Sequence, residues 1–196
     1  MFAERNLNSV LIVSSTDKSA DYLAGVLPTD KFSPVVTVKN AGEAKRKLVD
    51  NVFDIVIINS PLSDEFGVQL AIDLSVPGTS GILVLVKSEV FEQVSFKVED
   101  YGVLTVAKPT NRQVITQTVN LLAATRRRMK ALENKALTLE AKMAEIRLVN
   151  RAKIVLMREL KMTEPEAHRF IEKSAMDMCI KKGEVAKNIL TTYDTQ

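Results

Sequence analysis

The sequence has few of the residues that cross-link a fold or hold a metal ion. Its 196 residues include one cysteine, Cys179, and one histidine, His168. A single cysteine excludes an internal disulfide framework, and one histidine beside it makes no zinc-type ligand cluster. We therefore expect no metal and no other cofactor, and we predict that Cys179 is a small core residue of a helix.

Catalytic motifs and long apolar runs are also absent. The sequence has no pair of nucleophile and base and no glycine-rich loop that would cradle a phosphate, so we predict that the protein is not an enzyme. No stretch approaches the roughly 20 apolar residues that cross a bilayer. The opening residues, MFAERNLNSV, lack the basic and apolar segments of a secretory signal, and we predict a cytoplasmic protein that binds no membrane.

The composition is that of a globular protein, with 46% hydrophobic and 26% charged residues, but the charge is unevenly distributed. Residues 1–125 hold 11 Lys and Arg against 14 Asp and Glu, a net charge of −3, whereas residues 126–196 hold 16 against 10, a net charge of +6. This division suggests a sensing domain joined to a basic output that binds a polyanion. The alternative interpretation is a lysine-rich helix surface that is simply exposed to solvent.

The first part of the chain alternates between short apolar runs and segments with helical spacing. Strands are predicted at 9–15, 34–38, 54–59, 81–86 and 102–107, and helices at 17–27, 41–50, 68–75, 89–98 and from Asn111 onward. Continuous apolar runs are typical of strands that are buried on both faces of a parallel sheet, with the helices as crossovers. We predict an α/β, flavodoxin-like sheet of five parallel strands, whose functional crevice lies at the carboxyl ends of the strands.

Residues 8–122 resemble the receiver (CheY-like) domain of two-component response regulators. That family has two acidic residues after the first strand that hold magnesium, a phosphoryl-accepting aspartate after the third, a Ser or Thr after the fourth, and Lys-Pro after the fifth. The corresponding residues here are Ser14, Ser15, Asn59, Val86 and Lys108-Pro109. Only the Lys-Pro pair matches the family pattern.

The resemblance therefore implies a pseudo-receiver that is not phosphorylated at the usual site. Hydroxyls substitute poorly for carboxylates around Mg²⁺, and the amide oxygen of Asn59 is not a competent nucleophile toward phosphorus. We do not expect Asp17, Asp64 or Glu65 to replace the missing carboxylates. Lys108 is predicted to hydrogen-bond Asn59 or nearby backbone carbonyls, because an unpaired buried ammonium is costly. Its alternative role is to bind a different anionic ligand.

One long helix is predicted from Asn111 to about Leu160, a stretch without proline or glycine. Its apolar residues recur at alternating steps of three and four, which is the a/d seam of a coiled coil. The seam consists of Leu122, Thr125, Met129, Leu132, Ala136, Leu139, Met143 and Ile146. In a parallel, in-register pair, Arg128 and Lys135 would face Glu133 and Glu140 of the other copy. We predict a homodimer; the alternative, above all for Met143 and Ile146, is packing against the chain's own C-terminal helices.

The C-terminal segment is predicted to close a small all-α bundle of three helices. Thr163 and Glu166 form a capping box and Pro165 lies in the first turn, so a second helix begins there, and residues 181–193 supply a third. The predicted core consists of Ile146, Val149, Leu156, Leu160, Phe170, Ile171, Met178, Val185 and Ile189. The predicted domains are therefore 1–122, a coiled-coil linker at 123–146, and 147–196.

Residues 150–190 resemble the ANTAR domain, the RNA-binding output module of transcription antitermination regulators. The resemblance consists of Ala152, Lys153, Leu156 and Met157, then Thr163, Glu164, Glu166 and Ala167, then Ser-Ala-Met at 174–176, and finally Val185 and Ala186. Ile154 departs from the glycine usual at its position. The resemblance implies that the protein binds paired RNA hairpins in a nascent leader transcript, so that polymerase passes a terminator.

Lysine and arginine side chains would supply much of the RNA affinity through phosphate contacts. The first candidate is Lys153, followed by Arg147, Arg151, Arg158, Arg169, Lys173, Lys181 and Lys182. Two alternatives remain open, a protein-interaction adaptor and a DNA-binding response regulator. Without phosphorylation, the input would be a regulatory protein bound to the receiver-like domain, a small ligand or the expression level.

Overall fold

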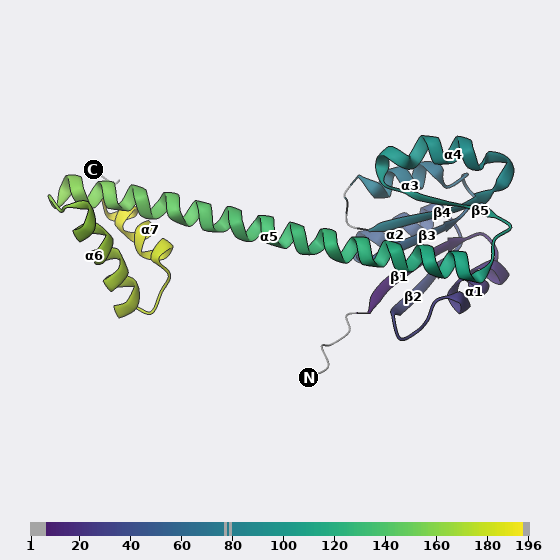
Figure 1. Ribbon diagram of the computed structural model, residues 1–196, viewed down its shortest axis with the longest axis horizontal. Helices are drawn as coiled ribbons and strands as arrows, with labels where there is room; N and C mark the ends of the chain where they lie inside the picture. Colours follow the sequence, from purple (N-terminus) through teal and green to yellow (C-terminus); the bar gives the residue numbers. More distant parts are fainter. Residues whose placement is uncertain (1–6, 77, 79, 194–196) are drawn as a thin grey trace. The chain divides into compact units, whose positions relative to one another are not determined.

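The computed structural model describes residues 7–76, 78 and 80–193, which belong to two compact units, Met1–Lys130 and Ala131–Gln196. The long helix α5 (Arg112–Glu159) contributes residues to both units (Figure 1). Its bounds confirm the predicted helix from Asn111 to about Leu160. None of the helices in the described ranges combines the length and the apolar character needed to cross a bilayer.

The first unit contains one five-stranded parallel sheet in the order β2-β1-β3-β4-β5. The strands are β1 (Asn8–Ser14), β2 (Phe32–Val38), β3 (Ile55–Asn59), β4 (Gly81–Lys87) and β5 (Leu104–Lys108). The helices between them are α1 (Asp17–Val26), α2 (Ala41–Asp50), α3 (Val68–Ser75) and α4 (Phe91–Val98), with short 3₁₀ turns at Ser88–Val90 and Glu99–Tyr101. This strand order confirms the predicted flavodoxin-like fold.

Two apolar clusters hold the helices against the two faces of the sheet. Since successive side chains of a strand point to opposite faces, Leu11 and Val13 pack toward α2, α3 and α4, whereas Val10 and Ile12 pack toward α1 and the start of α5. Figure 1 shows the same division of helices between the faces. The sheet is therefore buried on both sides, as its continuous apolar runs predicted.

The second unit consists of the C-terminal part of α5, α6 (Glu164–Asp177) and α7 (Lys182–Tyr193). The predicted capping box is present at the start of α6. The Glu166 carboxylate accepts hydrogen bonds from the backbone N–H and the hydroxyl of Thr163, at 2.8 and 2.7 Å. The local signal in the sequence thus placed the start of α6 correctly.

The core of the second unit differs in part from the predicted one. Leu156, Ile171, Val185 and Ile189 are buried as predicted, and Val149 packs against them partly buried. The predictions for Ile146, Leu160, Phe170 and Met178 were wrong, because all four side chains are exposed. The other buried positions include four alanines, namely Ala152, Ala167, Ala175 and Ala186. Small side chains let the helices approach closely, which leaves less room between them for an aromatic ring.

Cys179 is also not a core residue. It is exposed and lies in the turn after α6 with a φ of 53°, in the left-handed region. The N–H of Cys179 donates to the Met176 carbonyl at 3.2 Å, and that of Ile180 to the Ala175 carbonyl at 3.1 Å. These two bonds form the Schellman motif that ends many helices, with cysteine at the position usually taken by glycine. The prediction failed because this position is set by helix termination, not by apolar spacing.

Candidate functional site

The carboxyl ends of β1, β3 and β5 carry a chain of polar side chains. The Asn59 amide donates to the Ser14 hydroxyl at 3.1 Å, and Lys108 Nζ donates to Asn59 Oδ1 at 2.7 Å and to the Ser60 carbonyl at 2.5 Å. This confirms the hydrogen bonds that we predicted for Lys108. Burial, and next the charge of Lys87, lower the pKa of Lys108.

The neighbouring carboxylates all have partners away from this network. Asp17 forms an exposed ion pair with Lys39 at 3.1 Å. Asp64 accepts the N–H groups of Ala41 and Gly42, each at 3.0 Å, and these bonds lower its pKa. Glu65 accepts the N–H of Leu70 at 3.1 Å. Within the described residues, no cluster of three or more His, Cys, Asp or Glu side chains is placed to hold a metal ion.

The position after β4 needs a correction. Val86, which we aligned with the Ser or Thr of the family, is fully buried and packs in the cluster with α2, α3 and α4. The next residue, Lys87, ends β4 in register with Lys108 and is exposed. Because β4 ends at Lys87 and the Val86 side chain is buried, Lys87 and not Val86 lies at the carboxyl ends of the strands. These ends therefore carry two lysines, Lys87 and Lys108.

A small pocket of about 340 Å³ lies between α5, α6 and the start of α7. Its lining residues are Lys142, Glu145, Ile146, Val149, Asn150, Lys153, His168 and Lys182. Lys153 Nζ is 2.6 Å from Glu164 Oε1, and only 17% of its side chain is exposed. The hydrogen bond from Lys153 lowers the pKa of Glu164. We call this hollow the lysine pocket.

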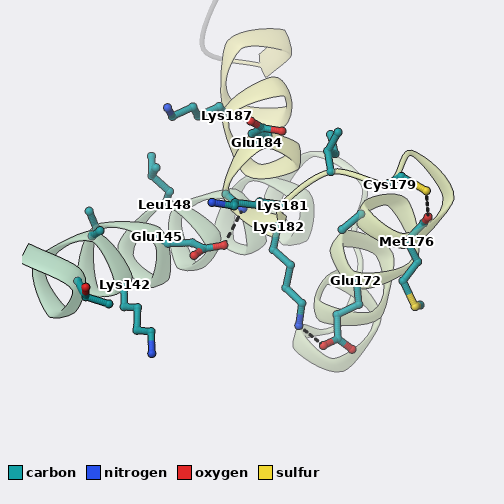
Figure 2. A pocket seen from close by; sticks show the side chains of 16 residues that line it. Lys142, Glu145, Leu148, Glu172, Met176, Cys179, Lys181, Lys182, Glu184 and Lys187 are labelled. Atoms are coloured by element: carbon teal, nitrogen blue, oxygen red, sulfur yellow. Dashed lines mark hydrogen bonds and ion pairs between the residues drawn. The ribbon is translucent and has the colours of Figure 1, made fainter. Parts of the chain in front are cut away.

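A larger and more open hollow of about 1160 Å³ adjoins the lysine pocket, with Lys142, Glu145 and Lys182 lining both. Figure 2 shows Lys182 reaching from the start of α7 to Glu172 on α6, with which it forms an ion pair. His168 Nε2 also lies 3.3 Å from Glu172. The Glu145 carboxylate accepts the N–H of Gly183 at 3.2 Å. The hydrogen bond from Lys182 is the main cause of a lowered pKa at Glu172.

The structure brings together only some of the predicted RNA contacts. Lys153 and Lys182 line the lysine pocket, and Lys181 lines the larger hollow. The other candidates are exposed residues that line neither hollow, namely Arg147, Arg151 and Arg158 on α5 and Arg169 and Lys173 on α6.

Sequence reasoning missed four residues of the lysine pocket, Lys142, Glu145, Asn150 and His168. For Lys142 a signal existed. Lys142, Ile146, Val149 and Lys153 follow one another at steps of three and four, which places them on one face of a helix. His168 comes from another helix, and only the packing of α6 on α5 brings it to the pocket.

The predicted coiled-coil seam is exposed over most of its length. Met129, Leu132, Ala136, Leu139 and Met143 all lie on the surface of α5. Leu122 does not: it is buried in the first unit, where its side chain packs over Gly81. The exposed part of the predicted seam therefore begins at Thr125. The alternative that Met143 and Ile146 pack against the chain's own C-terminal helices is wrong, because both are exposed.

The family comparison decides what the second unit is. The sequence model of the ANTAR domain matches residues 137–190. This chain carries an ANTAR domain. The match begins inside the predicted linker at 123–146, so the linker and the ANTAR domain share residues 137–146. Within the ANTAR domain lie both hollows and all the candidate RNA contacts.

Comparison with known proteins finds a relative by sequence and several solved structures that resemble the first unit. The transcriptional regulatory protein PdtaR of Mycobacterium tuberculosis is 28% identical over 143 residues, which is 72% of this chain and 69% of PdtaR. Solved receiver domains share the fold of the first unit. That of an HD domain-containing protein from Pseudomonas fluorescens Pf-5 has a TM-score of 0.59 at 16% identity, covering 67% of this chain and 96% of that one. The chemotaxis response regulator CheY4 of Vibrio cholerae has a TM-score of 0.53 at 18% identity, covering 60% and 99%. The first unit thus has the fold of receiver domains.

Proposed function

We propose that this protein is an RNA-binding transcription antitermination regulator that binds the hairpins of a leader transcript as a homodimer. The observation that carries the proposal is the ANTAR domain together with the lysine pocket inside it. Lys142, Lys153 and Lys182 come from two helices that are distant in sequence and converge on one hollow. Lysines that converge on one hollow favour a role in ligand binding over a role as ordinary solvent-exposed surface charges.

The lysine pocket is close to electrically balanced before RNA binds. Glu164 pairs with Lys153, and Glu172 pairs with Lys182. Among the described residues, Lys142 has no ion-pair partner. RNA phosphates would compete with the two glutamates for their lysines, while Lys142 is available at once. The balance also gives the pocket hydrogen-bond acceptors, which a base edge needs and a phosphate does not.

Dimerisation through the exposed seam would present two ANTAR domains to two hairpins. Linking two sites raises the apparent affinity through effective concentration, provided that both can be occupied together. Control of the dimer would therefore control RNA binding. The receiver-like domain lacks the phosphoryl-accepting aspartate, so we propose that its input is a bound regulatory protein, a small ligand or the expression level rather than phosphorylation at Asn59.

The test measures binding of a two-hairpin leader RNA to the full chain and to its Lys153→Ala and Lys142→Ala variants across a range of salt concentrations. Each variant is expected to bind about tenfold more weakly, and to lower the slope of log affinity against log salt by about one. Lys130→Ala is the matched control, because it removes the same charge from α5 outside the family match. It should change binding much less.

The same assay separates the alternative functions. Duplex DNA should not compete with the RNA; strong competition would favour a DNA-binding response regulator. A pure protein adaptor would bind neither nucleic acid. Equal, salt-insensitive RNA binding by the parent chain and Lys153→Ala would overturn the assignment of the site.

A further inference from the structure

The exposed apolar face of α5 continues beyond the predicted seam into the ANTAR domain. Met143, Ile146, Ile154 and Met157 are 38–62% exposed. At 3.6 residues per turn, these four and Asn150 fall within an arc of about 80°. Val155, which packs into the bundle core, follows Ile146 by nine residues and so lies on the opposite side of the helix. This face is therefore not the one that holds the bundle together.

The heptad pattern of the seam continues along this face. With Met129, Ala136 and Met143 at a positions, the next two a positions are Asn150 and Met157. The d position between them is Lys153, whose side chain turns to Glu164. Ile154, the neighbouring e position, supplies the apolar surface there. The exposed apolar face thus continues for about three helical turns beyond Ile146.

Asn150 is the one polar a position between Met129 and Met157. Its side chain is exposed, and no hydrogen bond from the described residues reaches its amide. In a parallel, in-register pair of helices the two Asn150 amides would face each other, and each can donate to the other's oxygen. In an antiparallel or shifted pair each amide would face an apolar side chain and lose its bonds to water.

We propose that the homodimer seam extends through α5 to Met157, with the two Asn150 amides hydrogen-bonded to each other so that the helices associate in parallel and in register. A single asparagine at an a position has this effect in coiled coils, where it sets register and a two-stranded state at some cost in stability. The inference rests on the homodimer in the proposed function and adds the residues and the direction of the contact.

The extended seam has a consequence for RNA binding. Ile146 and Asn150 belong both to the seam and to the lining of the lysine pocket. Each copy's pocket therefore borders the contact with the other copy. A fixed register holds the two pockets in one mutual arrangement, which is the condition for binding two hairpins at once.

Single-cysteine variants of the full chain test the contact. Cys179→Ser removes the one native thiol, and Asn150→Cys, Leu139→Cys or Ala141→Cys is then added and oxidised. A disulfide needs Cα atoms about 4.4–6.8 Å apart, so only facing residues cross-link. Asn150→Cys and Leu139→Cys should give covalent dimers. Ala141→Cys, an exposed f position on the opposite side of α5, is the control and should not.

The outcomes separate the inference from the proposed function. If Leu139→Cys cross-links and Asn150→Cys does not, the homodimer stands and the extended seam is overturned. If all three variants are monomeric and none cross-links, both are overturned. Equal cross-linking by Ala141→Cys would indicate random collisions and would also overturn the inference.

A second variant tests the role of the amide in the full-length chain. Asn150→Leu should lower the dimer dissociation constant about tenfold in sedimentation equilibrium, because an apolar layer replaces a polar one. It should also lower the yield of the Leu139→Cys cross-link, since register is no longer specified. An unchanged dissociation constant together with an unchanged cross-link yield would place Asn150 outside the seam and overturn the proposal.

Discussion

Lys108 Nζ lies 2.7 Å from Asn59 Oδ1, at the edge of the sheet where response-regulator receivers carry their phosphoryl-accepting aspartate. The ammonium also donates to the Ser60 carbonyl, so one side chain joins the end of β5 to the residues that follow β3. The amide of Asn59 extends the network to Ser14 on β1. The amide, the hydroxyl and the ammonium of this network thus satisfy one another through hydrogen bonds.

Incubation with a small phosphoryl donor and Mg²⁺ should leave the mass of the protein unchanged. The amide of Asn59 cannot accept a phosphoryl group, and hydroxyls replace the metal-binding carboxylates. Intact-mass spectrometry checks this, with a receiver domain that retains its aspartate as the control for the donor. A phosphoaspartate anywhere in residues 8–122 would refute the pseudo-receiver assignment.

Lys108→Met should destabilise the receiver-like domain by about 1–3 kcal/mol, because it leaves the Asn59 and Ser60 oxygens without their donor. Urea unfolding followed by the near-ultraviolet signal of tyrosine measures this, since Tyr22 and Tyr101 lie in the first unit. Lys87→Met is the matched control. It removes the charge that disfavours the protonated form of Lys108 and should leave stability unchanged or slightly higher. Equal losses in both variants would contradict the prediction.

Glu164→Gln should strengthen RNA binding roughly three- to tenfold, because it releases Lys153 from its ion pair while the net charge rises by one. Asp177→Asn adds the same charge at the end of α6, where Asp177 is exposed, lines neither hollow and, among the described residues, pairs with no candidate RNA contact. Fluorescence anisotropy with the leader RNA compares the two. A similar gain in both variants would mean that net charge alone, and not Lys153, accounts for the effect.

Cys179→Gly should raise the thermal stability of the ANTAR domain by about 0.5–1 kcal/mol. Cys179 has a positive φ that costs a residue with a Cβ atom about 1–2 kcal/mol, and the greater freedom of glycine in the unfolded chain offsets part of the gain. Thermal unfolding by circular dichroism measures the change. Cys179→Ala, which keeps the Cβ atom but removes the thiol, should show no such gain. An equal gain would mean that the thiol, and not the positive φ, destabilises the domain.

The ANTAR domain should lose stability as the pH falls below about 4.5. The hydrogen bond from Lys182 lowers the pKa of Glu172 below its ordinary value of 4.5, so the folded form binds this proton less tightly than the unfolded chain. The stabilisation by the ionised Glu172 carboxylate is therefore fully present above pH 4.5 and is lost as the pH falls through the lower pKa of the folded state. Thermal unfolding from pH 7 to pH 3 checks the sign. Glu172→Gln should make the thermal stability depend less steeply on pH. An unchanged slope of stability against pH in this variant would contradict the prediction.

Local spacing in the sequence determined the secondary structure of this protein. The apolar runs gave five parallel strands, and the capping box of Thr163 and Glu166 gave the start of α6. The absence of proline and glycine gave the full length of α5. These features depend on residues within a few positions of one another, where backbone geometry and side-chain periodicity decide the outcome.

The tertiary structure alone decided which faces meet. Leu122 has the periodicity of the seam, yet it is buried because Gly81 has no side chain and leaves room for it. Phe170 has helical spacing, yet it is exposed because alanines bring the three helices close together. Lys142, Lys153 and His168 form one pocket only because α6 folds back on α5. Periodicity marks the apolar side of an element, but close approach between distant residues determines what that side contacts.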